Sequence, residues 1–164
     1  ISSMFLHGGW MHLIGNMAYL YIFGDNIEDE LGKFKFIIFY IFCGIFAALC
    51  QALVDMNSDT PMIGASGAIS GILGAYIILF PKKEIKIFFW FIIFFKIFKI
   101  PAMYVIGVWI FFQFFSFNNG QENNIAYAAH IGGFITGLIL IFFLRKNKMR
   151  HSKNFNKSSL PNSN

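Results

Sequence analysis

Five stretches of apolar sequence, separated by short polar connections, constrain this chain more than any other feature. They cover residues 9–23, 34–54, 65–80, 102–117 and 126–144. A helix needs about 20 mostly apolar residues to cross the hydrocarbon core of a bilayer. Only 13% of the 164 residues are charged, whereas a soluble domain has about a quarter. The sequence therefore predicts an all-α, polytopic transmembrane bundle, whose shorter helices are buried among the others.

A sixth apolar segment, residues 84–100, is interrupted by lysines and ends just before Pro101. Lysine side chains in such a segment can reach the lipid headgroups while their stems stay in an apolar layer. We expect this segment to lie at the membrane interface rather than to span the bilayer. Pro101 favours a new helix start directly after it.

The basic residues predict the orientation of the bundle. All 13 Lys and Arg follow the first, third or fifth apolar stretch, and none lies in residues 1–8, 55–63 or 118–125. Cytoplasmic loops carry the excess of Lys and Arg in membrane proteins. This alternation predicts five spans and a cytoplasmic C-terminus, and it makes the net charge of +5 a topology signal. Residues 1–145 would form the membrane domain, and residues 146–164 a basic polar tail that we expect to be disordered.

Polar side chains within the first stretch form a candidate site. His12 and Asn16 are four residues apart, so they share one face of a helix. They could form a hydrogen-bonded pair between helices, or serve a functional site, because polar groups in spans usually face the bundle interior. No carboxylate or cysteine joins them at ligand spacing, so we do not expect a metal site.

The segment GASGAISG, residues 64–71, begins the third stretch and contains Ser66. Gly67 and Gly71 leave one helix face nearly bare, which allows transmembrane helices to approach closely. Helix packing could explain this serine too. Ser66, however, lies at the entry of the helix, where its backbone N–H belongs to the unpaired first turn and can bind an anion.

His130 lies near the start of the fifth stretch and is followed by Gly133 and Gly137. These two glycines, four residues apart, predict a packing contact with the bare face of the third helix. That contact would bring His130 to Ser66.

The predicted orientation places His12, Ser66 and His130 at similar depth, toward the outer ends of their helices. A serine nucleophile needs an adjacent base, and histidine can be that base. His12, Asn16 and the Ser66 N–H are suitable donors to an oxyanion. No Asp or Glu lies near these residues within a span, so the sequence predicts a Ser-His dyad rather than a triad.

These motifs, in this order, resemble the rhomboid family of intramembrane serine proteases. The resemblance rests on His12-x-x-x-Asn16, Gly64-Ala-Ser66-Gly67 and Ala129-His130-x-x-Gly133-x-x-x-Gly137, with support from YIFGDNIEDELG at residues 21–32. It implies a six-helix core of which this chain supplies the second to sixth helices, with the first helix upstream of Ile1. It also implies that Ser66 is the nucleophile, that His130 is the base, and that His12, Asn16 and the Ser66 backbone bind the oxyanion.

The resemblance further implies that residues 118–125 cap the site and that the substrates are transmembrane helices of other proteins, cut near the outer face. It implies no cofactor. Members of the family often carry an aromatic residue one turn after the nucleophile, where this chain has Ser70. The His130 ring is then less fixed, unless another aromatic residue such as Tyr127 covers it.

Two other functions stay open. A non-catalytic rhomboid-like protein would bind client transmembrane helices, but such relatives usually lack the serine or the histidine. A transporter or channel would need intramembrane carboxylates, and the spans contain none. The short loops favour a multi-pass protein of the bacterial cell membrane, with an organelle as the alternative.

Overall fold

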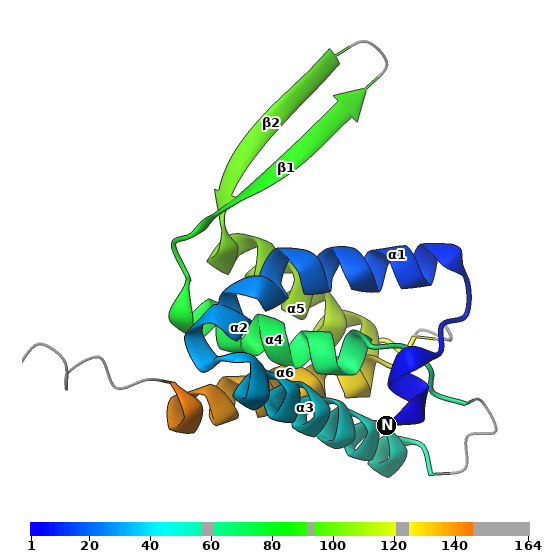
Figure 1. Cartoon of the computed structure of the whole chain (residues 1–164). Coiled ribbons are helices and arrows are strands. Elements are labelled where there is room, and N and C mark those ends of the chain that lie inside the picture. Colours follow the sequence, from blue (N-terminus) through cyan, green and yellow to red (C-terminus); the bar gives the residue numbers. More distant parts are fainter. Residues whose placement is uncertain (57–60, 92–93, 121–124, 146–164) are drawn as a thin grey trace, which may run out of the picture.

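The structure, a computed structural model, describes residues 1–56, 61–91, 94–120 and 125–145. The predicted tail at residues 146–164 lies outside these ranges, as do residues 121–124 of the predicted cap. The chain forms a bundle of helices α1 to α6 with one β-hairpin (Figure 1). The elements are α1 (Trp10–Tyr19), α2 (Asp25–Leu31), α3 (Lys33–Val54), α4 (Ser66–Leu79), β1 (Glu84–Phe91), β2 (Phe94–Pro101), α5 (Ala102–Asn118) and α6 (Tyr127–Leu144).

Each of the five predicted apolar spans contains one main helix, which confirms the helical-bundle class. The first helix extends further than predicted, because one π-helical turn (Leu20–Gly24) joins α1 directly to α2. Gly32 then separates α2 from α3, with a φ of 82° that glycine adopts without the steric cost of a side chain.

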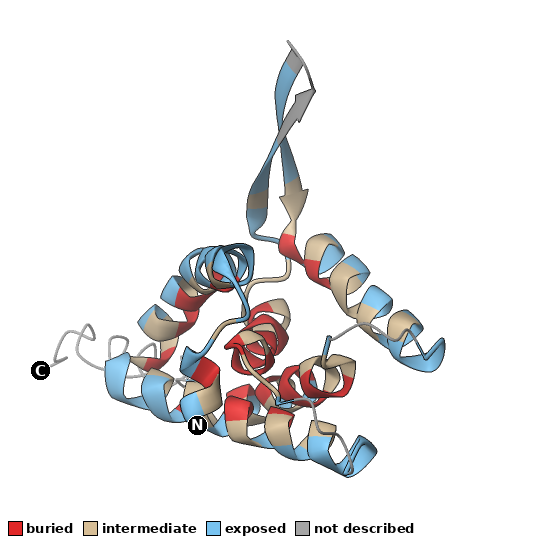
Figure 2. Ribbon diagram, turned by 90° about the vertical axis from the view of Figure 1, so that its right-hand side faces the viewer, coloured by how far each residue is buried: buried red, intermediate tan, exposed pale blue. Residues whose placement is uncertain are grey.

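Helix α4 occupies the centre of the bundle. Every residue from Gly67 to Tyr76 is buried, and Figure 2 shows the surrounding helices buried mainly on their inward sides. A Cβ atom at Gly71 would overlap the Cys43 side chain of α3 and would lie 3.1 Å from the Gly133 carbonyl oxygen of α6. The small residues of α4 thus allow two helices to approach its backbone at once.

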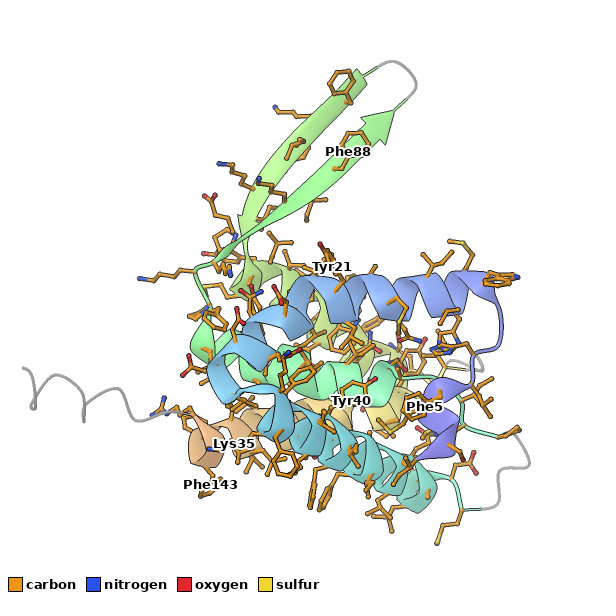
Figure 3. All side chains as sticks on the ribbon, viewed as in Figure 1. Phe5, Tyr21, Lys35, Tyr40, Phe88 and Phe143 are labelled. Carbon is orange, nitrogen blue, oxygen red and sulfur yellow. The ribbon has the colours of Figure 1, made fainter. Side chains whose placement is uncertain are left out.

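The outer surface of the bundle is apolar. Phe34 is 78% exposed and Phe143 is 82% exposed, and Figure 3 shows the side chains of Tyr21 and Phe143 pointing away from the helices. By length and composition, α3 and α6 could each cross a membrane, and α4 and α5 are shorter apolar helices. A continuous apolar exterior of this kind suits contact with lipid rather than water.

Strands β1 and β2 form a β-hairpin that projects from one end of the bundle (Figure 1). Its strands pair antiparallel from Glu84 opposite Pro101 to Phe91 opposite Phe94. The fold is therefore not purely helical. The predicted start of a helix after Pro101 is correct, since α5 begins at Ala102. Because the hairpin returns to the end of the bundle where α4 stops, α5 runs back along the bundle.

The two ends of the bundle differ in charge. Lys33 begins α3, Lys82 and Lys83 follow α4, and Arg145 follows α6, all at the left-hand end in Figure 1. There Lys83 donates a hydrogen bond to Asn26. At the opposite end, the Gly64 N–H donates to the Ser3 carbonyl at 2.9 Å. The first turns of α1, α4 and α6, which contain the predicted site residues, lie at this second end.

Candidate active site

Ser66 is the first residue of α4. The turn before it contains Gly64, with a φ of 112° that side chains rarely permit. Because Ser66 opens the helix, its N–H has no acceptor within the helix. The same residue thus offers a hydroxyl group and a free backbone donor.

His130 lies in the first turn of α6, and its Nε2 is 2.8 Å from Ser66 Oγ. The glycines around this pair account for the short distance. A Cβ atom at Gly133 would overlap the Gly67 carbonyl, and one at Gly137 would overlap the Gly71 carbonyl. Helices α4 and α6 therefore meet backbone to backbone, which lets two residues 64 positions apart hydrogen bond directly.

Two residues of α5 complete the surroundings of His130, and neither was predicted from the sequence. Gln113 Oε1 is 2.8 Å from His130 Nδ1. The Trp109 ring lies beside the imidazole, with 5.9 Å between ring centroids. Gln113 could have been found by the criterion that selected His12 and Asn16, because it is an amide within an apolar run.

Ser70 stands one turn after Ser66 and is only 1% exposed. Its hydroxyl donates a 2.6 Å hydrogen bond to the Ser66 carbonyl, so it is satisfied within α4. The aromatic ring beside His130 comes from α5 instead, as Trp109. The Ser70 position therefore contributes no aromatic support to the imidazole.

His12 lies directly against the turn that precedes Ser66. A Cβ atom at Gly64 would come within 2.7 Å of His12 Nε2, so only glycine fits there without displacing the ring. The Gly8 N–H donates to His12 Nδ1 at 3.4 Å. Because Nδ1 accepts, the neutral ring carries its proton on Nε2, on the side facing Gly64.

Asn16 lies one turn after His12 and is 7% exposed. Its Nδ2 is buried and has no hydrogen-bond partner among the described residues. A buried amide donor without an acceptor is costly unless a ligand or intermediate supplies one. Asn16 thus presents a donor that is free to bind an incoming group.

Residues of α1, α4, α5 and α6 line a cavity of about 240 Å³. Its walls include His12, Asn16, Ser66, Ser70, Trp109 and His130. The cavity combines a serine–histidine pair with polar donors, which is the set of groups that acyl transfer requires. Among the described residues, no three His, Cys, Asp or Glu side chains gather closely enough to hold a metal ion.

Comparisons with known proteins show which family this chain resembles. A model of the Rhomboid domain matches residues 1–147. The chain is 32% identical over 144 residues to RHOMBOID-like protein 5 of Arabidopsis thaliana, covering 88% of this chain and 43% of that protein. It is 33% identical over 168 residues to the rhomboid protease AarA of Providencia stuartii, covering 90% of this chain and 57% of that protein.

A third relative is the putative rhomboid protease YdcA of Bacillus subtilis, which is 30% identical over 152 residues, covering 92% of this chain and 68% of that protein. The chain thus spans between 43% and 68% of the length of these three relatives. Some of them are named proteases, and the plant protein is named only rhomboid-like.

Proposed function

Because this chain belongs to the rhomboid family, whose members are integral membrane proteins, we propose that it is an intramembrane serine endopeptidase. Ser66 is the nucleophile and His130 is the general base. The observation that supports this most strongly is the 2.8 Å contact between His130 Nε2 and Ser66 Oγ. This distance is within the range that a nucleophile and its base need.

In the first step, Ser66 Oγ attacks the carbonyl carbon of the scissile peptide bond while its proton passes to His130 Nε2. A C–O bond forms, and the carbonyl oxygen becomes an oxyanion. His130 then gives the proton to the leaving nitrogen, the C–N bond breaks, and an acyl ester remains on Ser66. Water, deprotonated by the same histidine, hydrolyses the ester and releases the second product.

The oxyanion would be bound by three donors: the Ser66 N–H, His12 Nε2–H and Asn16 Nδ2. Three observations support these roles. Ser66 begins α4, the Gly8 contact places the His12 proton on Nε2, and the amide nitrogen of Asn16 is buried without a partner among the described residues. The glycines Gly67, Gly71, Gly133 and Gly137 serve this site by holding α4 against α6.

The substrates would be transmembrane helices of other proteins, cut near the outer face. The site lies at the end of the bundle opposite Lys33, Lys83 and Arg145. By the positive-inside rule, that basic end faces the cytoplasm. Residues 1–145 would form the membrane domain and residues 146–164 a cytoplasmic tail. The bacterial cell membrane stays a prediction, because the relatives include bacterial, plant and mitochondrial proteins.

A second function is that of a rhomboid-like protein that binds client helices without cutting them. The plant relative named only rhomboid-like keeps this alternative open. A chain of that kind does not need a serine and a histidine at hydrogen-bond distance. The retained Ser66–His130 pair therefore favours the protease.

A fluorophosphonate probe tests the proposal, because it phosphonylates the hydroxyl group of an activated serine. The full-length protein in liposomes should be labelled, and mass spectrometry should place the adduct on Ser66. Ser66→Ala and His130→Ala should both lose the label while keeping the circular dichroism spectrum of the wild type. A folded wild-type protein that acquires no label would overturn the protease assignment and favour the client-binding alternative.

A further inference from the structure

We propose that Gln113 is a positioning residue that fixes the tautomer and the orientation of the His130 ring. This inference rests on the proposed function, since it concerns how His130 acts as a base. It adds a third residue to a site that the sequence predicts to be a dyad.

The imidazole of His130 has one hydrogen-bond partner at each nitrogen. Nε2 is 2.8 Å from Ser66 Oγ, and Nδ1 is 2.8 Å from Gln113 Oε1. A neutral imidazole carries one proton, so one nitrogen donates and the other accepts. To remove the Ser66 proton, Nε2 must have a free lone pair, which requires the ring proton to be on Nδ1. Gln113 Oε1 is the acceptor that this tautomer needs.

The orientation of the Gln113 amide is itself fixed by α5. Its Nε2 donates to the Trp109 carbonyl at 3.4 Å, and a carbonyl oxygen can only accept. Turning the amide over would set two oxygens against each other at Trp109 and would place an NH₂ group against His130 Nδ1. The contact with the Trp109 carbonyl therefore favours the arrangement in which Oε1 faces the ring.

Trp109 and Gln113 are one helical turn apart, so a single turn of α5 holds the imidazole in two ways. The Trp109 ring packs beside it, with 5.9 Å between centroids, and the Gln113 oxygen binds its far edge. This turn supplies the support that an aromatic side chain at Ser70 would otherwise give. Uncharged amides are known in the third position of histidine-based sites, as in the Cys-His-Asn proteases.

The hydrogen bond between His130 and Gln113 should become stronger as the reaction proceeds. When His130 accepts the Ser66 proton, the ring becomes positively charged, and the hydrogen bond from Nδ1–H to Gln113 Oε1 becomes charge-assisted. Gln113 does not line the cavity, so it acts through His130 and not by touching substrate. Its removal should therefore lower kcat and leave KM nearly unchanged.

The first test compares Gln113→Leu with Gln113→Glu in the full-length protein in liposomes. Leucine removes the acceptor, and we expect kcat and the rate of fluorophosphonate labelling to fall together by about 10- to 100-fold. Glutamate keeps an oxygen at the same reach, and its protonated carboxyl can also donate to the Trp109 carbonyl as the amide does, so it should retain most of the wild-type rate. Wild-type kcat in a folded Gln113→Leu protein, or an equal loss in both variants, would overturn the proposal.

The second test measures the ring directly, by solid-state NMR of the protein labelled with ¹⁵N-histidine. Subtracting the His130→Ala spectrum assigns the signals of His130. We expect Nδ1 to be protonated and Nε2 unprotonated in the wild type, and a mixture of tautomers in Gln113→Leu. The reverse tautomer in the wild type would overturn the proposal even if Gln113→Leu fails to fold. A wild-type protein that neither cleaves nor labels would instead show that the proposed function is wrong.

Discussion

Asn16 offers a direct test of the oxyanion donors at the scale of single residues. Asn16→Ala removes a buried amide that has no partner among the described residues, so the variant loses no hydrogen bond that the structure describes. If Nδ2 binds only the developing oxyanion, kcat should fall about 10²- to 10³-fold. KM should change little, because the interaction forms in the transition state. Steady-state cleavage of a model substrate measures both constants.

Asn26→Ala is the matched control, because it makes the same chemical change at the basic end of the bundle, where Asn26 bonds to Lys83. It should keep the wild-type kcat. An Asn16→Ala protein with the same kcat as Asn26→Ala would exclude Asn16 from the oxyanion site.

The reacting pair and the proposed oxyanion donors could be predicted from the sequence. The residues of α5 that hold the His130 ring were not predicted. His12, Asn16, Ser66 and His130 are polar groups at helix ends in an apolar chain, so their positions indicate a shared site. Gln113 and Trp109 lie within an apolar run. The amide of Gln113 marks it as a candidate site residue, but neither residue has a local pattern that points to His130. Only the rotation of α5 about its axis, set by packing against α6, brings them to the imidazole.

The contact between α4 and α6 can be tested at the scale of the elements. A Cβ atom at Gly137 would overlap the Gly71 carbonyl, so Gly137→Ala must push the helices apart. Overpacking of this kind costs about 1–3 kcal/mol of stability, which lowers Tm by several degrees. The altered separation should also weaken the Ser66–His130 hydrogen bond. Thermal unfolding followed by circular dichroism measures the shift.

Gly107→Ala is the control for this prediction, because no atom lies within 4 Å of the added Cβ atom. In a helix interior, alanine is favoured over glycine by up to about 1 kcal/mol. This control should therefore leave Tm unchanged or raise it. Equal Tm values for the two variants would contradict the tight contact between α4 and α6.

The β-hairpin formed by β1 and β2 was not predicted from the sequence. Its segment is apolar on both strands near the tip and basic near the base, with Lys86 opposite Lys99. Polar and apolar residues alternate only over residues 84–87, so most of the segment lacks the pattern of a strand with one buried face. The pairing of the strands depends on their register with each other, which a single apolar run does not specify.

At the scale of the whole molecule, the separation of a basic end from the end that contains the site could be predicted from the sequence. No contact between residues could be predicted as directly. The basic residues occupy one end, and the first turns of α1, α4 and α6 occupy the other (Figure 1). Alternation of charged loops was sufficient to predict this division. It was not sufficient to predict how closely the helices approach, because that depends on which glycines face one another across the bundle.

We propose that the Ser66–His130 pair cuts transmembrane helices at the end of the bundle opposite the basic residues. The most direct measurement is cleavage, in liposomes, of a model transmembrane helix with glycine and small residues near its outer end. A matched all-leucine helix serves as the uncleaved control, and mass spectrometry maps the cut. We predict one cut near the outer end by the wild type and none by Ser66→Ala. Equal cleavage by Ser66→Ala, or a cut confined to the cytoplasmic end, would contradict the account.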